Sequence, residues 1–377
     1  MEKIKLIGGD VGNDTIKLEL AEPNFEGKTE IEVMNIVAQG YNRRMISEEK
    51  AHLSNLLDVN IEINGNDIGR MFVGGIAFKE SRGDSLERTK ADVKATDINT
   101  IIVLMTSVAY ALYDPNNPVK TESIALGSLL PTEEYFIDAL QQEFMNKLNG
   151  TYKVKFNSPA FKKAEITLNI IDKEVTAEGA AGHLACIYEK DGKLKKGMEK
   201  IEDEVMLGIF IGSITTEVSV YANGDWESRG FFGIPLGTAD PLDKIIDDLG
   251  IEMTRHQIDY YVRTKKVLKA TINGQAVDLT AKLKAVSENR FAFFTKLMVN
   301  QIYKKLSLKG INTDLITRVN IGGGGGIILL DSFKKEFTKV GNVILAENAR
   351  FKNAEGALLS IIQKQSEQEA AADEVLG

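Results

Sequence analysis

The stretch that decides the fold lies near the N-terminus and reads DVGNDTIK over residues 10–17. An apolar run at Ile4–Ile7 precedes it, and polar and apolar residues alternate after it over Thr15–Leu20. Glycine, Asn and Asp between two such runs are typical of a tight turn. The sequence therefore predicts a strand, a polar turn and a second strand.

A hairpin of this composition has groups that suit a phosphate. Backbone N–H groups around Gly12 and Asn13 can surround an anion. Lys17 can reach the same anion as a point charge, and Asp10 can hold the hydration shell of Mg²⁺. Most isolated polar hairpins are only turns, so the assignment depends on further motifs later in the chain.

The same pattern restarts about 200 residues later. An apolar strand is predicted at Val205–Ile211 and another strand at Glu217–Tyr221, and a polar turn separates them. This recurrence predicts two similar α/β halves rather than a solenoid of short repeats. The two hairpins could clamp the phosphates of one nucleotide. The second turn would contribute Gly212, Ser213, Thr215 and Thr216.

A third motif is the run of five glycines at 322–326, which comes after an apolar strand predicted at Ile316–Ile321. Such a run is most often a flexible loop. Glycines there would let the backbone approach a flat ring closely.

Composition limits the classes of function. A chain of 377 residues corresponds to about two domains. The net charge of −8 argues against direct binding of nucleic-acid phosphates. With one cysteine, Cys186, and three dispersed histidines, neighbouring residues cannot form a Cys/His metal cluster, and a reducing cytosol is expected.

Neither a signal peptide nor a membrane span is expected. Charge and glycine interrupt the apolar run at the N-terminus. The longest uncharged run, Ile98–Tyr113, is shorter than the roughly 20 residues that a spanning helix needs, so we predict a buried core helix there.

In this order and spacing, the motifs resemble those of the superfamily that contains actin, the sugar kinases and the heat-shock ATPases. Within it, the chain is most similar to bacterial actin-like proteins of plasmid segregation, the ParM group. Residues 10–17 match the first phosphate loop of that group, lysine included, and residues 212–216 match the second. Gly322, Gly323, Gly324 and Gly325 match its adenosine loop, and residues 354–357 resemble its second interdomain connector.

The resemblance implies an α/β, actin-like fold, with two similar ribonuclease-H-like domains flanking a nucleotide cleft. Domain I is expected over 1–188, with a small subdomain at about 29–95 and a C-terminal helix at about 350–366. Domain II is expected over 189–349, with a small subdomain at about 240–310. A flexible acidic tail is expected over 367–377.

The resemblance also assigns roles to single residues. Glu178 falls at the first connector, where similar proteins carry the residue that polarises the attacking water; alternatively it is only a carboxylate that favours a helix start. Gly237 lies in a turn that resembles the ribose side of the nucleotide site, and Thr238 can equally be a helix N-cap. ATP or GTP and Mg²⁺ are the implied cofactors.

One position departs from the pattern. The second phosphate loop of the family usually begins with an Asp that orders the water shell of the metal, and Phe210 occupies that position here. Glu204 is the nearest acid on the strand, and Glu217 lies beyond the loop. Either Asp10 carries the metal shell alone, or hydrolysis is slow, or the register differs.

The implied function is a cytoplasmic bacterial ATPase, possibly also a GTPase, that forms homopolymeric filaments. Such a filament would segregate plasmid DNA through a DNA-binding adaptor, without binding nucleic acid or membrane itself. One alternative is a small-molecule kinase of the same superfamily, although no second acid is found in a comparable loop. Others are an actin-like cytoskeletal protein unrelated to segregation, and a chaperone-like or membrane-associated scaffold.

Overall fold

The computed structural model describes residues 3–43, 51–81, 92–272 and 274–376, with side chains up to residue 371. The chain divides into two compact units. Unit 1 comprises Met1–Leu194 and Asn353–Gly377, and unit 2 comprises Lys195–Lys352. Each unit is built on a sheet of its own.

Unit 1 contains a sheet to which nine described strands contribute, in the order β3-β2-β1-β7-β9-β8-β5-β6-β4. Its strands are β1 (Lys5–Val11), β2 (Thr15–Leu20), β3 (Glu30–Met34), β4 (Val37–Gln39), β5 (Leu57–Ile63), β6 (Asn66–Val73), β7 (Val119–Leu130), β8 (Gly150–Phe156) and β9 (Glu165–Ala177). Its helices are α1 (Gly75–Glu80), α2 (Ile98–Leu112), α3 (Thr132–Tyr135), α4 (Asp138–Lys147), α5 (Ala180–Ile187) and α10 (Lys352–Leu376).

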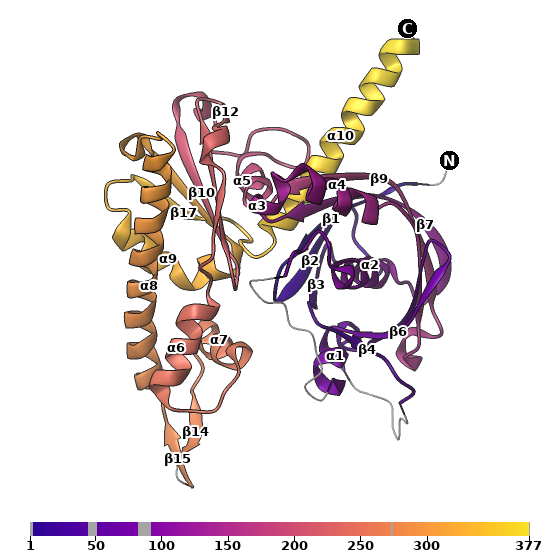
Figure 1. Ribbon diagram of the computed structural model, residues 1–377, viewed down its shortest axis with the longest axis horizontal. Coiled ribbons are helices and arrows are strands. Elements are labelled where there is room, and N and C mark those ends of the chain that lie inside the picture. The colour runs from indigo at the N-terminus through magenta and orange to yellow at the C-terminus, as the bar shows by residue number, and fades with distance from the viewer. Residues whose placement is uncertain (1–2, 44–50, 82–91, 273, 377) are drawn as a thin grey trace. The chain divides into compact units, whose positions relative to one another are not determined.

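The predicted buried helix is α2, and the sheet of unit 1 curls around it (Figure 1). Every residue from Thr100 to Ala111 is buried, which explains why this stretch carries no charge. Two of its buried hydroxyl groups bond to backbone carbonyl oxygens: that of Thr100 donates to Lys94 over 3.0 Å, and that of Ser107 donates to Val103 over 2.7 Å. The helix thus fills the core of unit 1 without exposing a polar face.

Helix α10 packs on the sheet of unit 1, where glycines on β1 and β7 let its backbone come close to the strands. A Cβ at Gly127 on β7 would lie 1.9 Å from the carbonyl oxygen of Ala357, and one at Gly8 on β1 would lie 2.2 Å from that of Ala354. Gly356 on α10 itself would meet the carbonyl oxygen of Ala181 at 1.9 Å. The small residues at 354–357 therefore allow α10 to pack directly on the sheet and on α5.

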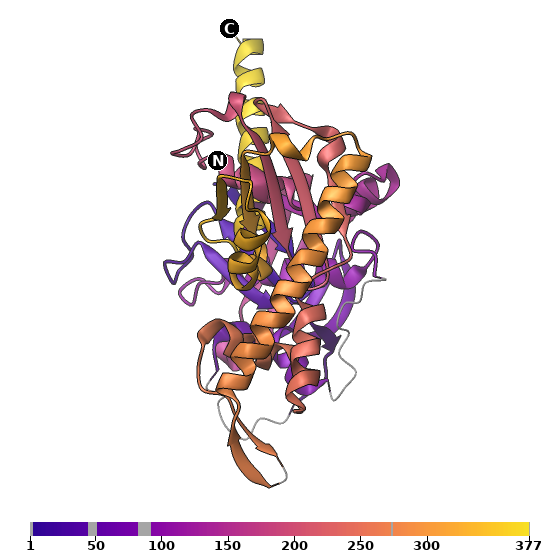
Figure 2. The same ribbon diagram turned by 90° about the vertical axis from the view of Figure 1, so that its left-hand side faces the viewer.

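Unit 2 contains a six-stranded sheet among its described residues, in the order β12-β11-β10-β16-β17, with β13 paired to β11, and a separate hairpin. Its strands are β10 (Val205–Ile211), β11 (Thr216–Ala222), β12 (Asp225–Trp226), β13 (Phe232–Ile234), β14 (Lys269–Ile272), β15 (Gln275–Asp278), β16 (Arg318–Gly322) and β17 (Asn342–Leu345). Its helices are α6 (Ala239–Leu249), α7 (Arg255–Thr264), α8 (Thr280–Leu308) and α9 (Gly323–Glu336). Figure 2 shows the β14–β15 hairpin beyond the first turns of the long helix α8.

The two units repeat one topology. In unit 1, β1 pairs antiparallel with β2 and parallel with β7, and β7 pairs parallel with β9. In unit 2, β10 pairs antiparallel with β11 and parallel with β16, and β16 pairs parallel with β17. The prediction of two similar α/β halves, drawn from the two hairpins, is confirmed.

Some predicted elements differ in extent. The described strands within 29–95, expected to form a small subdomain, join the same sheet and core as β1. The flexible tail expected over 367–377 is instead a continuation of α10 as far as Leu376. Among the described helices, none combines the length and the apolar character that crossing a bilayer requires.

Candidate functional site

The first candidate loop, Gly12–Asp14, connects β1 to β2 and is braced from a third segment. The side-chain amide of buried Asn35 donates to the Gly12 carbonyl oxygen over 2.7 Å. The backbone N–H of Asn35 donates to the Asp14 carbonyl oxygen over 2.9 Å. Asp10 and Lys17 face each other across the strand pair. The Lys17 Nζ lies 3.5 Å from where a Cβ at Gly12 would be. The structure therefore brings the ammonium group to the loop, as predicted.

Glu178 lies between the end of β9 and the start of α5, and it is 9% exposed. Its backbone N–H donates to the Leu130 carbonyl oxygen over 2.8 Å, and its own carbonyl oxygen accepts from the Thr132 hydroxyl over 3.2 Å. Its carboxylate pairs with the ammonium group of Lys94. The residue is thus held at both its backbone and its side chain.

The electrostatic surroundings of Glu178 include the charge of Asp10. Burial raises the pKa of Glu178; Lys94 opposes this shift, and the charges of Asp10 and Glu134 add to it. Raised pKa values of buried carboxyl groups that also have charged neighbours are common at functional sites. The charges of the two residues predicted to be catalytic therefore act on each other within unit 1.

In unit 2, the second candidate loop is packed against the turn that contains Gly237. The Thr238 N–H donates to the Gly212 carbonyl oxygen over 3.1 Å, and the Ala239 N–H donates to that of Ser213 over 2.8 Å. A Cβ at Gly237 would lie 2.2 Å from the Ser213 carbonyl oxygen, so only glycine fits this contact. Gly212, Ser213 and Gly237 thus form one structural group.

The side chains of this group have different surroundings. The Thr216 hydroxyl is buried and donates to the Leu236 carbonyl oxygen over 2.8 Å, so it fixes the turn. Ser213 and Thr215 are only partly buried. Thr238 is the N-cap residue of α6, as one of the two interpretations predicts, but its side chain makes no capping hydrogen bond.

The glycine run at 322–326 differs from its predicted conformation. It was expected to be a loop, but Gly322 ends β16 and Gly323 begins α9. The run therefore forms the first turn of a helix. The Gly323 N–H group donates to the Ala349 carbonyl oxygen over 2.8 Å, and the N–H groups that follow it in this turn are of the kind that can face an anionic or polar ligand. A Cβ at Gly325 would lie 2.4 Å from Cγ2 of Ile211 and 2.6 Å from Cγ2 of Thr238, so the second loop and this helix are in close contact.

Phe210 fills the position where the family usually has an Asp. The residue is 2% exposed, and a Cβ at Gly322 would lie 2.3 Å from its ring. The two nearby acids, Glu204 just before β10 and Glu217 on β11, have contacts of their own. Glu204 pairs with Arg318 at 2.8 Å, and a Cβ at Gly233 would lie 3.2 Å from the buried Glu217 carboxylate.

Some residues at these sites were missed by sequence reasoning. Lys94, Asn35 and Arg263 contact the candidate residues from segments with no recognisable motif. Arg263 on α7 donates from Nη1 to the Gly324 carbonyl oxygen over 2.8 Å. No local pattern in the sequence marks these residues, because their contacts arise from tertiary folding.

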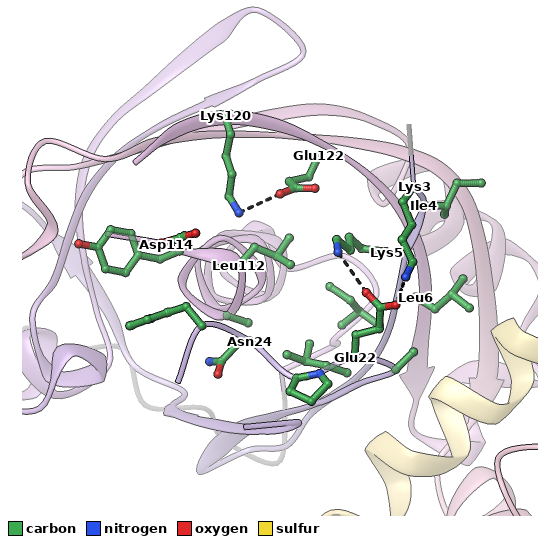
Figure 3. Close-up of a pocket in the computed structure, with 17 residues that line it drawn as sticks. Lys3, Ile4, Lys5, Leu6, Glu22, Asn24, Leu112, Asp114, Lys120 and Glu122 are labelled. Atoms are coloured by element: carbon green, nitrogen blue, oxygen red, sulfur yellow. Dashed lines mark hydrogen bonds and ion pairs between the residues drawn. The ribbon is translucent and has the colours of Figure 1, made fainter. Parts of the chain in front are cut away.

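Unit 1 also has a pocket of about 320 Å³ away from the first loop (Figure 3). It lies at the start of β1, whereas the loop comes after the end of this strand, about 20 Å further along. Its charged side chains pair with one another: Lys5 with Glu22 at 3.2 Å, and Lys120 with Glu122 at 2.8 Å. The pocket is separate from the candidate site.

The chain has the actin-like fold, as comparison with solved structures shows. It is similar to the crystal structure of actin-like protein Alp7A, with a TM-score of 0.78, 18% identity and 98% of each chain covered. It is also similar to Bacillus thuringiensis ParM with AMPPNP, with a TM-score of 0.69 and 16% identity over 97% of this chain and 100% of that one. Apo pSK41 ParM matches with a TM-score of 0.66 and 17% identity over 97% and 99% of the two chains. No protein-family model and no curated protein matches the sequence.

Gly237→Ala is expected to destabilise unit 2 by about 1–3 kcal/mol, the usual cost of overpacking a tight contact. The added methyl group would overlap the Ser213 carbonyl oxygen and displace the second loop. Urea unfolding measures the change. Gly341→Ala is the matched control, because a Cβ at that position of unit 2 meets no atom within 4 Å. Equal unfolding free energies for the two variants would contradict this account of the loop.

Proposed function

We propose that the protein is a nucleotide-dependent, filament-forming NTPase that segregates plasmid DNA in the bacterial cytoplasm. The observation that carries the proposal is the repeated strand–turn–strand hairpin, one in each unit, together with the buried Glu178 in the first unit, whose pKa is raised by burial and by the charge of Asp10. The actin-like fold and the likeness to Alp7A and ParM structures support it. Further structures of Bacillus thuringiensis ParM, to which the chain is also similar, are those with ATP and with ADP.

The described residues fit a nucleotide bound with Mg²⁺. Among them, no group of three or more His, Cys, Asp or Glu side chains could hold a metal ion alone. Mg²⁺ typically keeps several waters and is held by one or two carboxylates and the phosphates of a substrate, which suits Asp10. The close contacts at Gly237 and Gly325 exclude side chains from these two positions.

In this proposal, residues of each unit are assigned to the binding of a nucleotide. Gly12, Asn13 and Lys17 bind its phosphates from the first loop, and Gly212, Ser213, Thr215 and Thr216 bind them from the second. Gly237 lies at the ribose. Gly322, Gly323, Gly324 and Gly325 approach the base with their backbone. Bound Mg²⁺ would offset phosphate charge, with Asp10 accepting hydrogen bonds from its water shell.

The role proposed for Glu178 is to orient a water molecule for attack on the terminal phosphate. Phosphoryl transfer depends mostly on positioning and on electrostatic stabilisation, so a rigidly held carboxylate can contribute without covalent chemistry. Its backbone is fixed by Leu130 and Thr132, and its side chain by Lys94. Such anchoring limits the orientations that the carboxylate can adopt.

The partners follow from the proposed filament. The chain would associate with copies of itself, and a DNA-binding adaptor would link the filament to a plasmid site. A net charge of −8 is consistent with contact through a basic adaptor rather than with DNA itself.

Sedimentation of the purified protein with Mg²⁺ and ATP, GTP, ADP or no nucleotide tests this proposal. We expect pelleting that requires a nucleoside triphosphate, and the assay will also show which base is preferred. Phosphate release without pelleting at any protein concentration would favour the small-molecule kinase instead. A screen of sugars for stimulated turnover would then be the next experiment.

Asp10→Ala is expected to weaken Mg²⁺-dependent nucleotide binding by about 10- to 100-fold, the usual cost of removing a residue that orders the surroundings of a metal. Titration of Mg²⁺ at fixed nucleotide, monitored by fluorescence of a labelled nucleotide, measures the change. Asp14→Ala is the control, since Asp14 is an exposed acid of the same loop. If both variants bind as tightly as the wild type, the first loop is assigned incorrectly.

A further inference from the structure

A buried lysine lies beside the carboxylate proposed to orient water. The Lys94 ammonium group donates to Oε1 of Glu178, and the two side chains are only 4% and 11% exposed. Burying two charges is costly unless their geometry is good and further hydrogen bonds support them. The elements around the pair should therefore hold both partners in place, and they do.

Two helices fix the backbone of Lys94. The Glu134 carboxylate on α3 accepts from the N–H groups of Lys94 and Ala95, over 2.9 and 2.8 Å. The Thr100 hydroxyl on α2 donates to the Lys94 carbonyl oxygen over 3.0 Å. The peptide groups on both sides of the Lys94 Cα are thereby anchored, which directs its side chain at Glu178.

The same short segment also holds the other partner. The Thr132 hydroxyl, two residues before Glu134, donates to the Glu178 carbonyl oxygen over 3.2 Å. The Leu130 carbonyl oxygen at the end of β7 accepts from the Glu178 N–H. Residues 130–134 therefore set the separation between Lys94 and Glu178.

We propose that Lys94 is a positioning residue, held by Glu134, that fixes the orientation of the Glu178 carboxylate for water activation. This inference rests on the proposed function. By engaging Oε1, the ammonium group restricts rotation of the carboxylate and leaves Oε2 as the oxygen that can accept a hydrogen bond from water. Small errors in the position of a reacting group can lower a rate by about 100-fold, so this restraint matters to the rate.

The test compares Lys94→Met with Lys94→Arg. We expect Lys94→Met to lower kcat for phosphate release by about 10- to 100-fold while the nucleotide Kd changes by less than about 3-fold, because the lost restraint acts on the attacking water rather than on the phosphates. Lys94→Arg, which keeps the charge, should recover most of the rate. Equal losses in both variants, or a Kd that rises as much as kcat falls, would overturn the proposal.

A stability measurement covers the case in which Lys94→Met folds poorly. Lys94→Met leaves the buried Glu178 carboxylate without its partner, which should lower the free energy of unfolding. The double variant Lys94→Met/Glu178→Gln removes that unpaired charge and should regain part of the lost stability. A double variant no more stable than Lys94→Met alone would show that the side chains of Lys94 and Glu178 are not coupled. Unfolding needs no nucleotide, so this measurement tests the Lys94–Glu178 pair even if the proposed function is wrong. The proposed function itself is tested by phosphate release from the wild-type protein.

Discussion

The Glu178→Gln variant is expected to release phosphate about 100- to 10,000-fold more slowly than the wild-type protein, the range typical for loss of a general base. Its affinity for the nucleoside triphosphate should hardly change, because the loops proposed to bind phosphate are intact. Filaments formed by this variant should persist, since the hydrolysis that would destabilise them is slow.

Phosphate release under single-turnover conditions measures this effect, with Glu133→Gln as the matched control. Glu133 is an exposed acid of α3, one residue after Thr132, and no contact that the structure describes joins it to Glu178. Wild-type rates in Glu178→Gln would remove Glu178 from the mechanism.

The pH dependence of the wild-type rate depends on the same residue. Burial raises the pKa of Glu178 above its ordinary value of 4.5, and only the ionised carboxylate can accept a proton from water. Phosphate release should therefore fall as the pH is lowered through this raised pKa. Glu178→Gln should lack that limb of the profile, and an identical limb in the variant would assign it to another group.

Phe210→Asp is expected to destabilise unit 2 by more than about 4 kcal/mol rather than to raise the rate of hydrolysis. Removing a buried phenylalanine side chain costs about 3–5 kcal/mol, and a buried, unpaired carboxylate adds to this loss. Phe210 is 2% exposed, and its ring occupies the space above Gly322. Restoring the usual acid of the family would thus disrupt the contact between β10 and the start of α9.

Chemical denaturation of Phe210→Asp and of Phe210→Leu, which keeps the position apolar, measures this effect. The leucine variant should lose much less stability than the aspartate variant. A folded Phe210→Asp protein of nearly wild-type stability with faster phosphate release would contradict this account. It would show that the missing acid limits hydrolysis.

The sequence predicted the two hairpins and the buried helix α2, because the residues that determine them are close together in the chain. The hairpins at 10–17 and 205–221 were readable because glycine and small polar residues interrupt apolar strands. The buried helix α2 was readable because no charge interrupts residues 98–113. Each of these signals reflects the conformation or the burial of a single segment.

The features that the sequence did not reveal depend on contacts between distant segments. The glycine run was predicted to be a loop, but it begins α9. Larger residues at Gly322 and Gly325 would collide with Phe210 and Ile211, and these contacts cannot be seen in the local sequence. Lys94 could not be identified, since it lies 84 positions from Glu178 and meets it only after folding. The candidate catalytic residue was thus predictable by resemblance, but its partner was not.

The most direct test of the central claim is light scattering and phosphate release recorded in one sample after nucleoside triphosphate and Mg²⁺ are added to the wild-type protein. We predict scattering that rises on addition and decays as phosphate appears, and a rise without decay for Glu178→Gln. Scattering that does not depend on the triphosphate, or that decays equally fast in both proteins, would contradict a filament whose lifetime is set by hydrolysis at Glu178.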